Sequence, residues 1–252
     1  MPELPVEILG IAVAITLFAG FVKGAVGFAM PLIMVSGLTS IMDPAVAVAA
    51  IILPIVVSNV VQTFRTGLGP AVEAVVSVWR YLVAVCAAIA VFAQFVPHID
   101  PQVFYLILGV PVVIISLVQL VGVRLVIPPR HRGWAEWAAG LVSGMLGGLA
   151  GTWGPTTVLY LLAIETPKVR QIVVQGVIYG AGSFTLLAAH LASGVLNTAT
   201  APLSAALVLP ALGGVWLGFQ LQDRLDQSRF RKAVLAVLIV TGANLVRKGL
   251  GW

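Results

Sequence analysis

The sequence predicts an all-α membrane protein, a polytopic helical bundle built from two inverted repeats. Three observations lead to this fold class: apolar runs of membrane length, a glycine pattern that occurs twice, and the placement of the charges. Hydrophobic residues make up 60% of the chain and charged residues 9%, and mean hydropathy is +1.08. Apolar runs of about twenty residues, enough to cross a bilayer, recur along the whole length. These values exclude a soluble domain.

The segment from 20 to 31, GFVKGAVGFAMP, interrupts the first apolar run with glycines and a lysine. Its pattern occurs again 124 residues later, in GMLGGLAGTWGP. The matched residues are Gly20, Gly24, Gly27 and Pro31 in the first copy and Gly144, Gly148, Gly151 and Pro155 in the second. Interrupted helices at corresponding positions of two halves indicate the binding site of a transporter. Close helix packing is the alternative use of such glycines.

The first half is predicted to be a broken segment followed by three transmembrane helices. Residues 6–40 are apolar for 35 positions. As one helix they would be about 52 Å long, against a hydrocarbon core of about 30 Å. We therefore expect two legs, 6–22 and 28–40, that form a hairpin. Asp43 and Pro44 favour the start of the next helix. The expected helices span 43–65, 79–96 and 103–127, with an amphipathic stretch at 71–77 before the second.

The second half repeats this plan, a broken or hairpin segment plus three transmembrane helices. The broken segment is expected at 134–164. The first of the three helices is expected to start in the segment TPKVRQ, at 166–171, and to run to about Ala192; the other two are expected at 200–221 and 230–247. Between the halves, the stretch rich in proline and arginine is the clearest linker in the chain. The predicted domains are a first transmembrane repeat at 1–127, a cytoplasmic linker at 128–133 and a second transmembrane repeat at 134–252.

The charges predict the orientation in the membrane. With this arrangement, 11 of the 14 Lys and Arg residues fall on the side of the linker, in the loops at Arg65 to Arg80, Arg124 to Arg132, Lys168 to Arg170 and Arg224 to Lys232. The other side holds Glu3, Glu7, Asp43 and Asp100, with Arg247 and Lys248 as exceptions. By the positive-inside tendency the linker side is cytoplasmic and both termini are outside. Because each half makes an odd number of crossings, the repeats are inverted. Nucleic acid is not an expected partner, since the cations sit at the ends of apolar runs.

A break inside the membrane frees backbone N–H and C=O groups, and a small anion could satisfy the N–H groups. We expect the glycines to shape such a site, Lys23 to supply charge, and Thr152, Asn59 and Gln175 to donate hydrogen bonds. A lysine inside an apolar run costs about 2.5 to 3.5 kcal/mol, so it is usually functional or paired. Its alternative is snorkelling to an interface. The predicted substrate-binding residues are Lys23, Gly24, Gly27, Asn59, Gln62, Gly148, Gly151, Thr152, Trp153, Gln175 and Ser183.

Several other polar residues have an equally simple structural use. Gln62 and Ser183, together with Gln171, Thr156 and Thr157, could hold helices together through interhelical hydrogen bonds. His190 could relay protons, because an imidazole ordinarily titrates near pH 6.5. We expect it instead near the outer interface. Trp153 lies inside the second break and is expected to line the transport path.

Three groups of segments carry a family likeness: FAGFVKGAVGFAMPLI with DPAVAVAA, GLVSGMLGGLAGTWGPTTVLYL with TPKVRQ, and LGGVWLGFQLQDRL with FRKAVLAVLIVTGANLV. They resemble the sulfite exporter TauE/SafE family of bacterial membrane proteins, over essentially the whole chain. These glycine and proline patterns identify the family better than the substrate. The resemblance implies an exporter or importer of sulfite, organosulfonates or other small anions in the bacterial inner (plasma) membrane. Lys23 departs from the small or apolar residue expected there.

The sequence therefore predicts a secondary transporter, an exporter of small anions that works by alternating access. An importer or channel for another small organic anion is the alternative. An intramembrane enzyme that pairs Ser183 with His190 is weaker, because no acid or oxyanion partner accompanies the pair. No enzyme activity, cofactor or metal is expected, since the chain has one cysteine, Cys86, and lacks a His/Cys cluster. The coupling ion, a proton or sodium, and the oligomeric state stay open.

Overall fold

The computed structural model describes residues 5–64, 67–123, 125–222 and 226–251. Within these residues the regular secondary structure is helical, which confirms the all-α class. The helices are α1 (Val6–Val26), α2 (Met30–Leu38), α3 (Pro44–Phe64), α4 (Leu68–Ser77), α5 (Trp79–Phe92), η1 (Ala93–Phe95), α6 (Pro101–Val121), η2 (Pro129–His131), α7 (Arg132–Ala150), α8 (Gly154–Ala163), α9 (Lys168–Ala192), α10 (Ala201–Ala206), α11 (Val208–Gln222) and α12 (Gln227–Gly249).

Five helical segments are long and apolar enough to cross a membrane. They are Val6–Val26, Pro44–Phe64, Pro101–Val121, Arg170–Ala192 and Ala201–Leu221. A sixth crossing results if α4 is joined to the segment Trp79–Phe95, although the pair is bent by 83°. The chain is therefore a multi-pass helical membrane protein.

The helix starts follow from local capping chemistry. The Asp100 side chain accepts hydrogen bonds from the backbone N–H groups of Gln102 and Val103, over 2.8 and 3.3 Å, and Pro101 occupies the first helical position of α6. The Asp43 carboxylate accepts from Ala45 N over 2.8 Å at the start of α3. Both aspartates satisfy N–H groups that the helix itself cannot bond.

Two predicted boundaries are corrected by the structure. The first leg of the hairpin was predicted to end at residue 22, but α1 continues to Val26 because the left-handed turn is made by Gly27, at φ +88°. The helix predicted at 103–127 ends at Val121, where Gly122 takes φ +78°. The crossing predicted at 200–221 is found as the apolar segment Ala201–Leu221, with an irregular residue, Leu207, between α10 and α11. Pro210 lacks the N–H that would bond the carbonyl of Ala206 and continue the helix.

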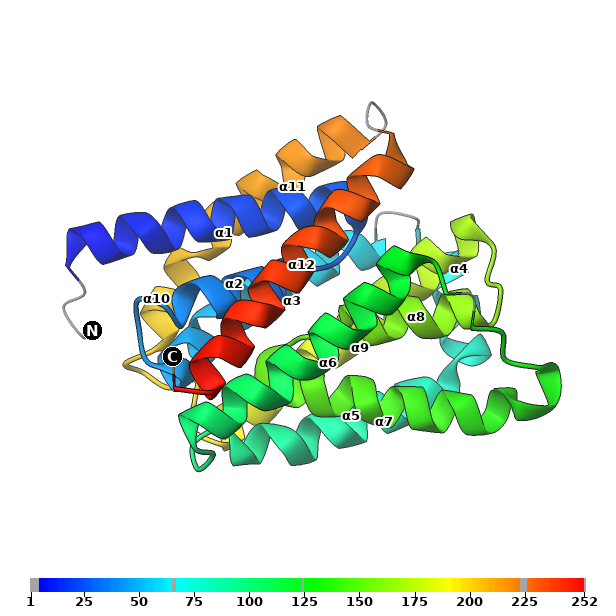
Figure 1. Ribbon diagram of the computed structural model, residues 1–252, viewed down its shortest axis with the longest axis horizontal. Coiled ribbons are helices and arrows are strands. Elements are labelled where there is room, and N and C mark those ends of the chain that lie inside the picture. The colour runs from blue at the N-terminus through cyan, green and yellow to red at the C-terminus, as the bar shows by residue number, and fades with distance from the viewer. Residues whose placement is uncertain (1–4, 65–66, 124, 223–225, 252) are drawn as a thin grey trace.

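The two halves have corresponding helices that run in opposite directions. In Figure 1 both termini lie at one end of the molecule, while the connection from α6 to α7 lies at the other, so α1 and α7 point opposite ways. The same packing occurs in both halves. Helix α1 packs on α11, and α7, which corresponds to α1, packs on α5, which corresponds to α11. The helices α3 and α9 contact each other, as do α6 and α12. The repeat limits 1–127 and 134–252, with a linker at 128–133, stay predictions.

Glycines allow the two closest helix pairs to touch backbone to backbone. A Cβ on Gly144 of α7 would lie 2.5 Å from the carbonyl oxygen of Val85 in α5. On α1, a Cβ on Gly20 would collide with the carbonyl oxygen of Ala211 in α11. Gly24 and Gly148 make equivalent close contacts one turn further on, with Val215 and Ile89. These four glycines of the repeated motif therefore serve helix packing.

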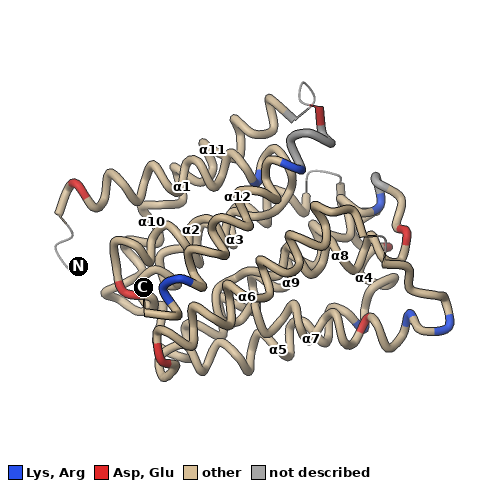
Figure 2. The backbone as a smooth tube through the Cα atoms, viewed as in Figure 1, with Lys and Arg blue, Asp and Glu red and all other residues tan. Residues whose placement is uncertain are grey.

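The described charges are divided between the two ends of the bundle (Figure 2). The basic residues near the linker end of their helices are Arg80, Arg130, Arg132, Arg170 and Lys232. The terminal end holds Glu7, Asp43 and Asp100, together with Arg247 and Lys248. Glu3, Arg65, Arg124 and Arg224 lie outside the described residues. The cytoplasmic placement of the linker stays a prediction from this asymmetry.

Reporter fusions test the orientation. Fusions at Gly69 and His131 are expected to give cytoplasmic signals, and a fusion at the C-terminus an external one. A cytoplasmic C-terminus would contradict the inverted topology, because the two termini and the linker would then share one side.

The packing role of the motif glycines can be measured as stability. Gly144→Ala is expected to cost about 1 to 3 kcal/mol by overpacking. The loss would be seen as a lower melting temperature of the purified protein in detergent. Gly10→Ala is the matched control in α1, because nothing lies within 4 Å of its added Cβ. Equal melting temperatures for the two variants would contradict close packing at Gly144.

Candidate functional site

The two helix breaks meet in the middle of the bundle and line one pocket. Its cavity volume is about 20 Å³, and it is partly open to solvent. A Cβ on Gly154, at the second break, would lie 3.1 Å from the Cβ of Phe28 at the first. The lining residues are Lys23, Phe28, Ala29, Pro31, Leu32, Asn59, Gly151, Thr152, Trp153, Gly154, Pro155 and Tyr179.

Each break ends one helix with glycine and begins the next with proline. The N–H of Gly27 bonds the carbonyl of Lys23 over 2.6 Å, and Gly151 makes the same bond to Gly147. Gly151 has φ +65°, and Ala29 also takes a left-handed conformation, at φ 81°. In both breaks a proline then follows at the start of the next helix, where its missing N–H leaves no bond unmade.

Lys23 is turned into the protein. The residue is only 3% exposed. Its Nζ donates hydrogen bonds to Ser58 Oγ, over 2.9 Å, and to Asn59 Oδ1. Asn59 Nδ2 in turn donates to the carbonyl of Tyr179 over 3.1 Å. Lys23, Asn59 and Tyr179 all line the pocket. The hydrogen bonds are made inside the bundle, and not at an interface as snorkelling would require.

No carboxylate neutralises this ammonium group among the described residues. The ion pair between Arg80 and Glu136, 3.5 Å apart, lies near the linker end and not at Lys23. The partners of Lys23, a hydroxyl and an amide oxygen, are neutral. A buried cation with neutral partners attracts an anion strongly, because the protein interior screens the interaction between the two charges less than water does.

The starts of two helices add to the positive potential. Both α2 and α8 begin at the pocket, where Leu32 and Pro155 belong to their first turns. The first N–H groups of a helix have no intrahelical acceptor, and the helix dipole is positive at this end. Such ends bind anions in many proteins.

Two glutamines support the first break without lining the pocket. Gln62 Nε2 donates to the carbonyl of Gly27 over 3.1 Å. Gln175 Oε1 lies 3.5 Å from the position that a Cβ on Gly27 would take. Both side chains are buried, and Gln62 Oε1 has no hydrogen-bond partner within the described part of the chain. A polar shell therefore surrounds the C-terminal end of α1.

The structure brings together some of the predicted residues and separates others. Lys23, Asn59, Gly151, Thr152 and Trp153 line the pocket, and Gly27 lies directly beside it. Gly24 and Gly148 lie instead in the helix contacts described above. Ser183 donates to the Gly180 carbonyl of its own helix over 2.8 Å and is not in the lining.

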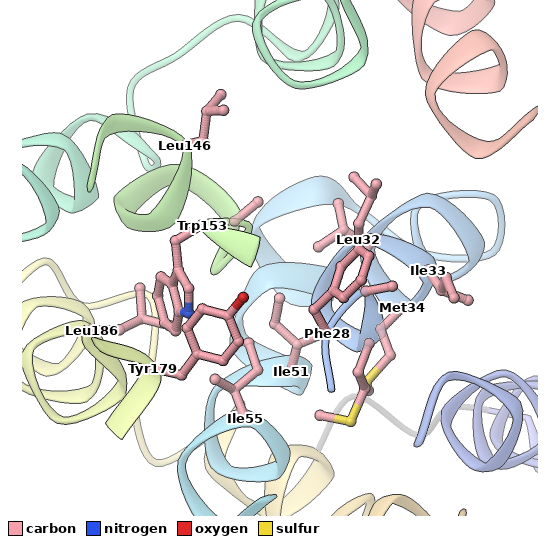
Figure 3. Packing of buried hydrophobic residues seen from close by; sticks show 14 of the residues in the cluster. Phe28, Leu32, Ile33, Met34, Ile51, Ile55, Leu146, Trp153, Tyr179 and Leu186 are labelled. Atoms are coloured by element: carbon pink, nitrogen blue, oxygen red, sulfur yellow. The ribbon is translucent and has the colours of Figure 1, made fainter. Parts of the chain in front are cut away.

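Sequence reasoning missed most of the aromatic lining. Trp153 and Tyr179 have ring centroids 6.4 Å apart, and Phe28 faces them from the first break (Figure 3). Tyr179 belongs to a polar stripe on α9, with Gln171, Gln175 and Ser183 at spacings of four, and that stripe was the available signal. Phe28 gives no signal in an apolar sequence.

His190 was expected near the outer interface, and it lies in the last turn of α9, at the end away from the linker. Its side chain is fully buried, because α9 packs there against η1 and α7. Its Nδ1 lies 3.4 Å from Ser193 Oγ, while Ser183 bonds its own helix. The Ser183 and His190 side chains therefore form no hydrogen-bonded pair. No group of three metal-ligating His, Cys, Asp or Glu residues occurs within the described ranges.

Comparison with protein families adds one finding. A family model described as Sulfite exporter TauE/SafE matches residues 12–245, which include both breaks and all the residues that line the pocket. The chain belongs to the sulfite exporter TauE/SafE family. The TauE/SafE family is one of membrane transporters of the sulfite or anion exporter type. Comparisons with curated proteins and with solved structures gave no significant match.

Proposed function

We propose that this TauE/SafE protein is a secondary transporter that exports small anions, such as sulfite or organosulfonates, across the bacterial inner membrane. The anion would bind in the pocket between the two breaks, which would open to each side of the membrane in turn. One observation carries this proposal: the buried ammonium of Lys23 lines a pocket at two helix starts and has only neutral partners. The outward direction rests on the family alone.

The pocket chemistry favours an oxyanion. Placing a lysine in an apolar membrane segment costs about 2.5 to 3.5 kcal/mol, and an anion would offset this cost by pairing with it. The helix starts offer N–H donors to the same solute, and these suit oxygen atoms that carry several lone pairs. The cavity volume in this conformation is about 20 Å³, close to that of one water, so even a small anion would need the pocket to widen as it binds.

The arrangement of the halves supports alternating access. Inverted repeats that meet at discontinuous helices are common in secondary transporters, and the solute binds between them. Here the pocket takes residues from both halves, with Lys23 and Asn59 from the first and Trp153 and Tyr179 from the second. A relative movement of the helices that carry them would change access to the pocket without dismantling either helix break.

The first test of this function removes the charge. Lys23→Met should weaken binding of sulfite roughly tenfold to hundredfold, because a charge-assisted hydrogen bond is lost. Binding would be measured by calorimetry on the purified protein with a panel of oxyanions. Lys23→Arg keeps the charge, but its larger planar group should recover binding only in part. Lys248→Met is the control, since Lys248 binds Thr39 and Ser40 outside the pocket. An unchanged dissociation constant in folded Lys23→Met protein would contradict the proposal.

A second test supplies an internal counter-ion. Asn59→Asp is nearly isosteric and places a carboxylate against the Lys23 ammonium. This variant should lose sulfite binding while it keeps its melting temperature, because an intramolecular ion pair replaces the one with the solute. Asn59→Ser, which shortens the side chain without adding charge, separates the effect of charge from that of the lost amide. Sulfite binding by Asn59→Asp at the affinity of the unmodified protein would show that the anion does not need a free Lys23.

A further inference from the structure

A buried cluster of four hydroxyl side chains lies directly behind the second break. Tyr81 comes from α5, Ser143 from α7, and Thr156 and Thr157 from α8. Tyr81 Oη lies 2.5 Å from Ser143 Oγ and 2.9 Å from Thr157 Oγ1, and Ser143 Oγ donates to Thr156 Oγ1 over 2.5 Å. None of the four residues is more than 7% exposed. The cluster connects the start of α8 to two neighbouring helices.

The cluster converges on one backbone oxygen, the carbonyl of Trp153. Thr156 Oγ1 donates to it over 2.9 Å and Thr157 Oγ1 over 2.8 Å. The backbone N–H of Thr157 donates to the same oxygen over 3.0 Å. Three donors therefore fix the direction of this carbonyl, and Tyr81 and Ser143 hold the threonine hydroxyls in place.

The direction of the carbonyl determines that of the next N–H. The described peptide bonds are trans, and in a trans peptide the C=O and the following N–H point opposite ways. The Trp153 oxygen points into the hydroxyl cluster, so the N–H of Gly154 points away from the cluster, and Gly154 itself lines the pocket. Gly154 is the first residue of α8, where an N–H has no intrahelical acceptor. The next residue, Pro155, has no N–H to offer.

The first repeat provides an internal comparison. Subtracting 124 from Ser143, Thr156 and Thr157 gives Ala19, Leu32 and Ile33, which are all buried and apolar. The carbonyl of Ala29, the counterpart of Trp153, accepts from Ile33 N over 3.1 Å, and no side-chain donor to it is seen among the described residues. The break can therefore be built without hydroxyls. Buried hydroxyl groups have a desolvation cost that hydrogen bonds only offset, so the second break carries a cost that the first break avoids.

We propose that the hydroxyl cluster positions the Trp153–Gly154 peptide so that the N–H of Gly154 donates a hydrogen bond to the transported oxyanion. This inference rests on the proposed function and assigns the site a second recognition element besides Lys23. One oxygen of a sulfite or sulfonate group would accept from the ammonium and another from the Gly154 amide. Tyr81, Ser143, Thr156 and Thr157 are positioning residues, since they act through the peptide and do not line the pocket.

The sequence allows the Gly154 amide to be observed alone. Of the six tryptophans, only Trp153 is followed by glycine. Protein labelled with carbonyl-¹³C tryptophan and ¹⁵N glycine therefore gives a single correlated amide signal, that of Gly154. Titration of the full-length protein with sulfite should move this amide proton downfield and saturate at the dissociation constant found by calorimetry. Lys23-dependent binding that leaves the Gly154 signal unmoved would overturn this inference alone. Absence of Lys23-dependent binding would overturn the proposed function and the donor role with it.

Variants separate positioning from general stability. Thr157→Val keeps the shape of the side chain but removes the hydroxyl; it should weaken sulfite binding roughly twofold to tenfold, the effect of one neutral hydrogen bond. It should also reduce the shift of the Gly154 signal. Thr157→Ser restores the hydroxyl and should restore both. Ile33→Val, at the matching position of the first repeat, should leave both unchanged. A folded Thr157→Val protein with unaltered affinity and an unaltered shift would overturn the positioning role.

Discussion

A helix that stops inside a membrane leaves backbone groups that water cannot satisfy, and here two such stops lie against each other. At the end of α1 the problem is solved by Gly27, whose N–H bonds back to Lys23 and whose carbonyl accepts from Gln62. At the starts of α2 and α8 the problem is solved only in part. Their first N–H groups have no intrahelical acceptor, and both starts line a pocket. Those N–H groups and the neighbouring Lys23, whose partners are neutral, are the features of this fold that suit it to bind an anion.

The sequence was enough to predict the helical membrane fold, the two breaks and five of the twelve lining residues. It could not separate the motif glycines by role. Gly27 and Gly151 are needed for a positive φ, whereas Gly20 and Gly144 are needed for close helix contact, and both uses require only the absence of a Cβ. Phe28 was missed for a different reason: an apolar side chain has no contrast within an apolar chain, so only the packed structure shows that it faces the pocket.

The two breaks have diverged while keeping one backbone plan. Lys23 corresponds to Gly147, and the space that a side chain would take at Gly147 is filled by the Trp153 ring, 2.6 Å from the position of an added Cβ. Trp153 corresponds to Ala29, which leaves room on the other side for Lys23 to reach Asn59. A charge in one break and an indole in the other are therefore alternative ways to fill equivalent space. The pocket is asymmetric because only one of them can bind an anion by charge.

The same packing limits how the proposed alternating access could proceed. The backbone contacts made through glycine join α1 to α11 and α5 to α7, and close contacts of this kind resist sliding because side chains cannot adjust between them. Each pair contains one helix from each repeat. Under the proposed mechanism, the units that move would therefore be these mixed pairs rather than the two repeats themselves. Helices α3 and α9 lie between the pairs. Hydrogen bonds beside the pocket link Lys23 of α1 to Asn59 of α3, and Asn59 to the Tyr179 carbonyl of α9. An anion that draws the Lys23 ammonium away from Asn59 would weaken this link, so binding itself would loosen the contact that movement of the pairs has to break.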